Sequence, residues 1–125
     1  MNSYVIDSSG WLEFFSGSAK AKVYRKYILS HQSLITPTLI LYEVYKKIVR
    51  EKSASEGILA VTQIQAQSKH VVPLNEKLSL FAADVSLKWK LAMADSIIYA
   101  TTLQEDATLV TSDHHFEGLK QVILI

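Results

Sequence analysis

The sequence predicts an α/β fold in three layers, with a central and mainly parallel sheet covered by helices on both faces. Short apolar runs typical of buried strands alternate with longer segments of helical periodicity, and two helices often stand between consecutive strands. That order indicates parallel strands, because a parallel neighbour is reached only through a crossover long enough to hold a helix. With 125 residues, 49% of them hydrophobic, we expect one domain over residues 1–125 with its own core.

Five segments are expected to be strands because each is short and apolar, and turn or capping residues bound them. The first runs into Asp-Ser-Ser-Gly, the second stops at Pro37, and the third stops at Asn75. The five segments comprise residues 4–6, 33–36, 70–74, 108–111 and 121–125. The crossovers between them should be right-handed, as parallel crossovers almost always are.

Six segments have helical character, and they comprise residues 11–15, 19–29, 38–52, 55–67, 76–88 and 94–104. Ser16-Gly17-Ser18 should end the first helix, and Pro37 suits the start of the third. We expect Asn75 to cap the fifth helix and Asp95 to be a possible cap for the sixth.

The periodicity of two of these helices predicts which side is buried. In the second helix the inward residues should be Val23 and Tyr27, with Tyr24 as a further candidate. In the fourth helix one side is formed by Ile58, Val61, Ile64 and Gln65.

Composition excludes several classes of protein. A net charge of +1 argues against a strongly basic nucleic-acid coat, so any nucleic acid must be met by a local patch. The absence of Cys excludes a disulfide framework, a thiolate metal site and a Cys nucleophile. The start, MNSYVID, lacks the features of a secretory signal, and no segment is long and apolar enough to span a bilayer. We therefore expect a cytoplasmic protein without membrane association.

Four carboxylates lie in or beside apolar runs, where an unpaired ionised carboxylate is costly. They are Asp7, Glu43, Asp95 and Asp113. The three aspartates each have an ordinary alternative role as a turn former or helix cap. Glu43 is harder to explain in this way, because it is the only charged residue between Leu39 and Tyr45; its alternative is a pairing with Lys46 or Lys47 across one turn.

Topology brings these acids toward one place, because ligands of open parallel sheets bind beyond the carboxyl ends of the strands. Asp7 and Asp113 follow strands, and the other two acids fall in the first part of helices, near the same edge. Clustered carboxylates repel one another, and one of them would take up a proton unless a cation held the group together. A set of oxygen ligands favours Mg²⁺ or Mn²⁺ over Zn²⁺. The hydroxyls of Ser9, Thr111 and Ser112 could orient the acids or a water molecule.

Four segments of the chain resemble the PIN domain, in particular the VapC-like toxins of toxin–antitoxin pairs. They are VIDSSGW, the lone glutamate in its apolar helix, ADSIIYATTLQ and LVTSDHHF, and their order and spacing match over the whole length. The resemblance implies a metal-dependent ribonuclease fold whose acids map to Asp7, Glu43, Asp95 and Asp113, with Thr111 supporting the last one. It also implies a homodimer and a small antitoxin whose tail covers the active site.

The expected activity is therefore endoribonuclease cleavage that depends on Mg²⁺ or Mn²⁺. Divalent ions reverse the negative charge of the site and clamp phosphate oxygens, and an ion-bound water can supply the nucleophile. We expect Asp7 and Asp95 to bind the principal ion, while Asp113 and Glu43 hold a second ion, position the water or act as base. His114 and His115 are further, weaker candidates for metal binding or acid–base chemistry.

Two basic clusters could contact RNA, although a solvated helix face is the simpler interpretation of each. One is formed by Lys20, Lys22, Arg25 and Lys26. The other is formed by Lys46, Lys47, Arg50 and Lys52. It is the better candidate, with Lys46, Lys47 and Arg50 as the expected RNA contacts, because it continues the helix that carries Glu43. Tyr42 and Tyr45 could serve a dimer or partner interface.

Two alternative functions stay open at this stage. A signalling receiver domain has a similar length and an acidic Mg²⁺ site, but it needs paired acids after the first strand, where Asp7 is followed by Ser-Ser. The second alternative is a catalytically silent PIN fold that serves as a binding module. Metal-dependent RNA cleavage would separate this module from an enzyme.

Overall fold

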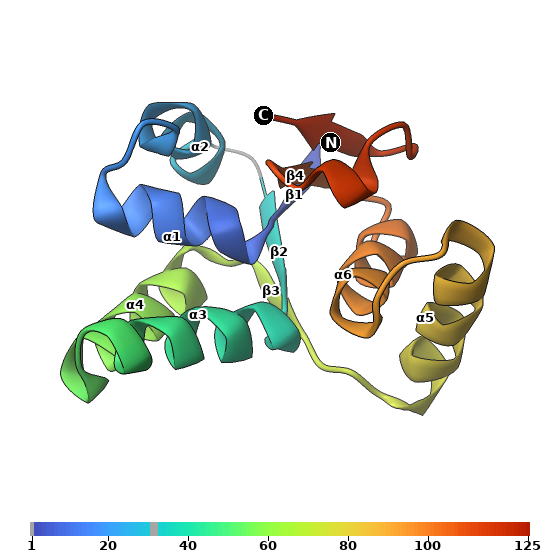
Figure 1. Ribbon diagram of the computed structural model, residues 1–125, viewed down its shortest axis with the longest axis horizontal. Coiled ribbons are helices and arrows are strands. Elements are labelled where there is room, and N and C mark those ends of the chain that lie inside the picture. The colour runs from blue at the N-terminus through green and yellow to red at the C-terminus, as the bar shows by residue number, and fades with distance from the viewer. Residues whose placement is uncertain (1, 31–32) are drawn as a thin grey trace.

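The computed structural model describes residues 2–30 and 33–125, and Figure 1 shows a sheet between two groups of helices. The strands are β1 (Ser3–Ile6), β2 (Ser33–Pro37), β3 (His70–Val72), β4 (Thr108–Thr111) and β5 (Val122–Leu124). In this part of the chain they form one sheet in the order β3-β2-β1-β4-β5, and each neighbouring pair is parallel. The predicted α/β class with a parallel sheet is confirmed.

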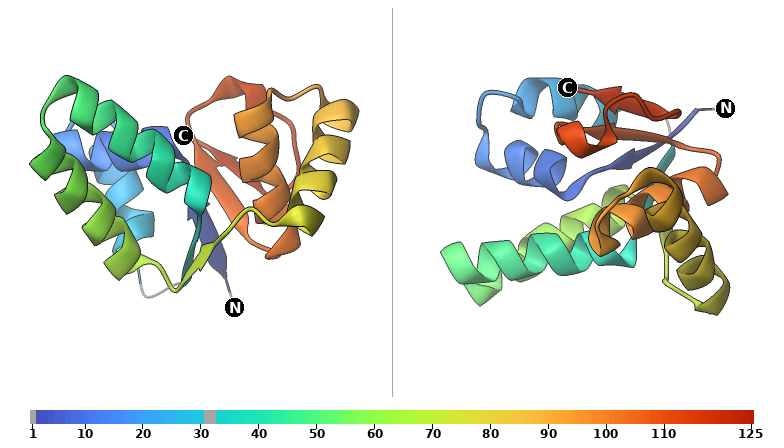
Figure 2. Two further views of the ribbon diagram at one scale, coloured as in Figure 1. Left: turned by 90° about the horizontal axis from the view of Figure 1, so that it is seen from below. Right: turned by 45° about the vertical axis from the view of Figure 1, so that its right-hand side comes forward.

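The helices are α1 (Ser8–Ser16), α2 (Ala21–Ile28), α3 (Thr38–Glu51), α4 (Ala54–Gln67), α5 (Glu76–Trp89) and α6 (Met93–Gln104), with a short 3₁₀ turn η1 (His114–Phe116). Figures 1 and 2 show α1 to α4 on one side of the sheet and α5 with α6 on the other, which completes the three layers. The strand order also rules out the receiver alternative, because receivers follow the order 2-1-3-4-5, whereas β1 here lies between β2 and β4.

The pairing of β1 with β4 determines where two polar residues meet. Ile6 is in register with Val110, and the backbone N–H of Asp7 donates to the Val110 carbonyl at 3.0 Å. Asp7 follows Ile6 and Thr111 follows Val110, so these two residues lie side by side at the carboxyl edge of the sheet.

Large aromatic side chains fill the core on both sides of the sheet. Trp11, Tyr24, Tyr99 and Phe116 are fully buried, so Trp11 belongs to the core. Gly10 is needed beside Tyr24, because a Cβ at this position would lie 2.4 Å from the tyrosine ring. Helix α1 can therefore approach α2 closely only because this residue has no side chain.

Two predicted helix faces were only partly right: Tyr24 and Ile64 are buried as expected, but other predicted members are not. In α2 the buried residues are Tyr24 and Ile28, whereas Val23 is 42% exposed. In α4 the buried residues are Gly57, Ala60 and Ile64. Both ends of the predicted stripe face solvent, since Ile58 is 55% exposed and Gln65 is also exposed. Helix α4 packs against α3 through small residues: a Cβ on Gly57 would lie 2.7 Å from a methyl group of Val49. Periodicity favoured the larger residues, but the close approach of the two helices selected the smaller ones.

Several predicted boundaries also moved. Helix α1 begins at Ser8, three residues earlier than predicted, because the Asp7 carboxylate accepts a hydrogen bond from the Ser8 N–H and caps the helix. Strand β3 ends at Val72 because Pro73 has no N–H to continue the ladder. Strand β5 begins at Val122, after Gln121 adopts a positive φ of 60°. Asn75 caps α5 as predicted, since its side chain accepts from the Leu78 N–H at 2.9 Å.

Within residues 2–30 and 33–125, no helix combines the length and apolarity that a membrane crossing requires.

Candidate functional site

The four predicted carboxylates meet in one pocket at the carboxyl edge of the sheet. The pocket has a volume of about 360 Å³ and is lined by Asp7, Ser8, Ser9, Glu43, Asp95, Ser112 and Asp113. The acids come from the end of β1, the second turn of α3, the first turn of α6 and the loop after β4. The expectation that topology would bring them together at this edge therefore agrees with the geometry.

Asp7 is the most deeply buried of the acids, with 6% of its surface exposed. One carboxylate oxygen accepts from the Ser8 N–H at 2.8 Å, and the other accepts from the Thr111 hydroxyl at 2.7 Å. Burial raises the pKa of Asp7; the two hydrogen bonds oppose this effect, and the charges of Asp95 and Asp113 add to it. Each oxygen keeps one lone pair for another partner.

Thr111 joins Asp7 to Asp113. Its fully buried hydroxyl donates to Asp7 and accepts from the backbone N–H of Asp113 at 3.0 Å. Asp113 in turn caps the η1 turn, where its Oδ1 accepts from the His115 N–H at 2.9 Å. The resemblance assigned Thr111 to the support of the last acid; the structure adds that its donated hydrogen bond goes to Asp7.

Asp95 was a candidate cap for α6, and that interpretation is wrong. The capping residue is Ala92, which has no side-chain cap, and Asp95 is the third residue of the helix. Its position in the first turn suits a negative charge, because the helix dipole is positive there. Burial raises the pKa of Asp95, the charge of Asp113 raises it further, and nearby His115 opposes both effects. The side chain serves the pocket and not the helix end.

Glu43 contributes a polar atom that lacks a partner. Within the described part of the chain, its Oε1 is buried and makes no hydrogen bond. Burial raises the pKa of Glu43, and Asp7 and Asp95 add to this rise, while the Ser8 side chain opposes it. The alternative pairing with a lysine is not seen, because Lys47 binds Glu51 at 2.8 Å. A buried, unsatisfied carboxylate oxygen beside two further acids fits a site for a hard cation.

Side chains around the acids make contacts whose partners the sequence did not specify. The Tyr24 hydroxyl, 2.5 Å from the Ser112 hydroxyl, fixes a residue that lines the pocket. His115 Nδ1 lies 3.2 Å from Asp113 Oδ1 and 3.5 Å from Asp95 Oδ2. The adjacent His114 pairs with Glu117 instead, at 2.8 Å. Ser9 is at the pocket, but among the described residues its buried hydroxyl makes no hydrogen bond.

The three predicted RNA contacts lie on the exposed part of α3, beyond Glu43. The Lys46 ammonium lies 5.5 Å from the centre of the Tyr42 ring. Lys47 and Arg50 both face Glu51, at 2.8 and 3.8 Å. All three therefore have a local partner in this structure, and Glu51 neutralises part of the positive charge.

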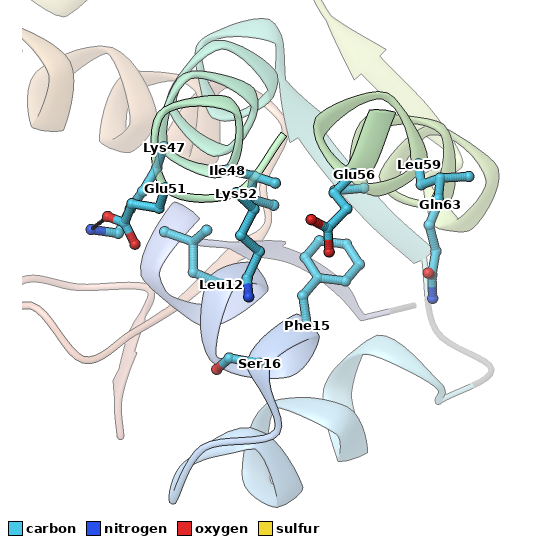
Figure 3. Close-up of a pocket in the computed structure, with 11 residues that line it drawn as sticks. Leu12, Phe15, Ser16, Lys47, Ile48, Glu51, Lys52, Glu56, Leu59 and Gln63 are labelled. Carbon is cyan, nitrogen blue, oxygen red and sulfur yellow. Dashed lines mark ion pairs between the residues drawn. The ribbon is translucent and has the colours of Figure 1, made fainter. Parts of the chain in front are cut away.

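A second, larger hollow of about 540 Å³ lies between α1 and the α3–α4 pair. We call it the α1–α3–α4 groove. Figure 3 shows Leu12 and Phe15 of α1 facing α3 and α4, with charged side chains at the rim. Its apolar lining includes Ile48 and Leu59, and it contains none of the four pocket acids. The acidic pocket is thus the candidate for chemistry, and the groove is a candidate for binding an apolar segment.

Comparisons with known proteins agree with this geometry. The family model described as "PIN domain" matches residues 4–121. The chain has no significant match among curated proteins.

Many solved structures share the fold, and three of them serve as examples. The chain is similar to a toxin–antitoxin complex from Klebsiella pneumoniae, with a TM-score of 0.79, 17% identity and coverage of 96% of this chain and 95% of that one. It is also similar to VapC20 from Mycobacterium tuberculosis, which is described as a sarcin-ricin loop cleaving toxin. The TM-score is 0.75 and the identity 14%, with coverage of 94% of this chain and 95% of that one. The third is VapBC-1 from nontypeable Haemophilus influenzae, with a TM-score of 0.74, 17% identity and coverage of 98% of this chain and 96% of that one.

The raised pKa values predict an unusual dependence of stability on pH. Because Asp7, Glu43 and Asp95 hold protons more tightly when folded, their protonation stabilises the metal-free fold. This stabilisation is complete below the ordinary carboxyl pKa of roughly 4 and is lost as the pH rises through the raised values. Glu43→Gln should therefore increase the stability of the metal-free protein at pH 8 and weaken its dependence on pH, measured by urea unfolding in EDTA between pH 5 and 8.

Glu51→Gln is the matched control on the same helix. Glu51 is exposed, and its hydrogen bond to Lys47 lowers its pKa, so removing its charge should leave stability at pH 8 unchanged or lower it. If both variants changed the free energy of unfolding by the same amount, the charge of Glu43 would not be the unfavourable one that its burial implies.

Proposed function

This chain belongs to the PIN domain family, and on that premise we propose that it is a divalent-metal-dependent endoribonuclease that acts as the toxin of a toxin–antitoxin pair. The observation that supports this most directly is the pocket itself. Four carboxylates from distant parts of the chain surround it, and one buried oxygen, Glu43 Oε1, has no partner among the described residues. Without a cation such a pocket is electrostatically unfavourable, so its composition makes sense as a cation site.

We assign the acids to different tasks according to how they are held. Asp7 is fixed by two donors, and Asp95 lies in the first turn of α6, so these two are proposed to bind the principal ion. Glu43 and Asp113 are proposed to hold a second ion, to orient the attacking water or to accept its proton. A bound Mg²⁺ or Mn²⁺ would supply charge neutralisation, polarisation of a phosphate oxygen and a lowered pKa of a coordinated water.

Substrate binding is proposed for the basic end of α3. Lys46, Lys47 and Arg50 follow Glu43 by three, four and seven residues, spacings that put them on the same side of the helix. Arg50 lies about 10 Å along the axis from Glu43, so it is proposed to contact a phosphate that flanks the cut. We also propose a cytoplasmic location, where such an enzyme would meet RNA.

The partner is proposed to be a small antitoxin protein that binds the α1–α3–α4 groove. Structures with the same fold are described as VapBC or toxin–antitoxin complexes. The groove and the acidic pocket share two helices: Ser8 and Leu12 lie on α1, and Glu43 and Lys47 lie on α3. A segment seated in the groove could continue along these helices to the acids, and so block RNA.

A homodimer is proposed through the outer surface of α5. Leu80 and Leu87 are two turns apart on this helix and are 72% and 82% exposed, and Met93 at the start of α6 is 76% exposed. Such a row of apolar side chains is more typical of an interface than of a free surface. Tyr42, at 59% exposure, belongs to a different helix and stays a candidate contact.

Metal-dependent cleavage of RNA is the test of the proposed enzyme. We expect the purified protein to cut RNA with Mg²⁺ or Mn²⁺ and not in excess EDTA, and not to require Zn²⁺. Asp7→Asn, Glu43→Gln, Asp95→Asn and Asp113→Asn should each reduce cleavage by about 100-fold or more, because each removes a charge that holds the cation.

Circular dichroism and thermal melts of each variant provide the control that the fold is intact. Wild-type cleavage by Asp95→Asn would refute the assignment of the acids. Metal binding and RNA binding without any cleavage would instead favour the silent binding module.

RNA affinity should depend on salt through the basic end of α3. Cations that neutralise phosphates release counterions, so replacing Lys46, Lys47 and Arg50 by Ala should lower the slope of log affinity against log salt by roughly one unit for each phosphate that is no longer neutralised. Cleavage at saturating RNA should fall much less. The measurement is a salt series of binding isotherms in the Asp95→Asn background, which prevents cleavage.

The matched control is the triple Ala variant of Lys22, Arg25 and Lys26 on α2, which removes the same charge elsewhere. If this variant changes the slope and the α3 variant does not, RNA binds at α2.

Binding of the antitoxin should depend on Leu59. This residue lines the groove and is 69% exposed, so Leu59→Glu should leave the fold intact and weaken binding of the small protein encoded beside this gene by about tenfold or more. Ile58 is its neighbour on α4, is 55% exposed and does not line the groove. Ile58→Glu should therefore co-purify with the partner like the wild type; loss of binding in both variants, or in neither, would place the partner elsewhere.

A further inference from the structure

We propose that His115 is a nitrogen ligand of the metal centre and that it makes the centre a mixed oxygen–nitrogen site selective for Mn²⁺ over Mg²⁺. The inference rests on the proposed function only in requiring that the acidic pocket holds a divalent cation. It concerns one side chain beyond the four carboxylates, and it specifies which cation the pocket prefers.

The positions of three atoms support this role. His115 Nδ1 lies 3.2 Å from Asp113 Oδ1 and 3.5 Å from Asp95 Oδ2, and one ligand atom of each residue lies within 4.8 Å of the others. Around a cation with bonds of roughly 2.1 Å, atoms at adjacent corners of an octahedron are about 3 Å apart. The two distances from the imidazole nitrogen are thus close to the separation of neighbouring ligands on one ion, and the carboxylate atoms are near enough to close around it.

The backbone holds His115 in this position. Its N–H donates to Asp113 Oδ1 at 2.9 Å, which ties the residue to a proposed ligand. The next residue, Phe116, is fully buried and anchors the η1 turn. The imidazole itself is 76% exposed, so it approaches the acids from the solvent side, whereas Asp7 is buried. It would complete the ligand set where the protein leaves the pocket open.

An ordinary ion pair between an imidazolium and two carboxylates is the alternative explanation of these distances. Exposed pairs of this kind contribute little, and a pair would need no particular ligand geometry. The orphaned Oε1 of Glu43 on the buried side of the pocket is not explained by an imidazolium at the mouth. A cation between the two sides would satisfy both the carboxylates and the imidazole.

The chemistry of the donors gives the selectivity. Carboxylate and water oxygens suit Mg²⁺ and Mn²⁺ alike, whereas imidazole nitrogen suits transition metals, whose affinity for such sites rises from Mn²⁺ onward. The sequence placed the four carboxylates first and left His114 and His115 as further candidates for metal binding; the structure separates the two histidines, because only His115 faces the acids. With His115 included, Mn²⁺ gains a bond that Mg²⁺ scarcely uses.

The test compares two neighbouring histidines in the full-length protein, stripped of metal. His115→Ala removes the proposed ligand; His114→Ala is the matched control, because His114 is equally exposed and pairs with Glu117. Binding of Mn²⁺ alone and Mg²⁺ alone is measured by calorimetry. Electron spin echo spectroscopy of bound Mn²⁺ then reports whether an imidazole nitrogen is coupled to the ion.

We expect nitrogen coupling in the wild type and in His114→Ala, and none in His115→Ala. The affinity for Mn²⁺ should fall about 10- to 100-fold in His115→Ala, whereas the affinity for Mg²⁺ should change less than about threefold. Absence of nitrogen coupling in the wild type would overturn the proposal, as would an equal loss of both ions, which indicates an electrostatic role only. If the wild type binds neither ion, the proposed function fails as well, so the two failures are distinguishable.

Discussion

Four carboxylates in one small pocket repel one another, and much of the surrounding structure holds them there against that repulsion. The Thr111 hydroxyl is at the centre of this arrangement, because it donates to Asp7 and accepts from the Asp113 N–H. Its position depends on the register of β1 with β4, which brings two residues 104 positions apart into contact. The first turns of α1 and α6 add N–H groups and a favourable dipole near Asp7 and Asp95.

These stabilising contacts leave part of the repulsion unrelieved. Burial raises the pKa values of Asp7, Glu43 and Asp95, and one oxygen of Glu43 has no partner among the described residues. Functional sites commonly retain such unfavourable features because the ligand relieves them. A cation bound here would therefore stabilise the fold as well as provide chemistry, since it binds the folded state only.

The two hollows of the molecule are connected through shared helices. Helix α1 begins at the acidic pocket and continues into the α1–α3–α4 groove, and α3 carries Glu43 on one side of this boundary and Lys47 and Ile48 on the other. A partner in the groove would lie beside the proposed RNA-contacting cations, two of which already face Glu51. Inhibition of the proposed enzyme would then need no distant conformational change, because partner and substrate would compete for adjacent surface.

The sequence by itself determined the alternation of strands and helices, and it located the four acids at one edge of the sheet. Those features depend on local periodicity, on caps such as Asn75 and on the general rule for parallel sheets. Tertiary structure decided what depends on contacts between distant segments. It buried Gly57 and Ala60 in place of Ile58, and it placed Asp95 inside α6 and not at the cap. It also brought His115 close to two acids. Within one helix several faces are similarly apolar, and only the shape of the neighbouring helix selects among them. Likewise, a side chain in a turn such as η1 can point toward solvent or toward the site. Its direction depends on the pairing of β1 with β4, two strands that are far apart in the sequence.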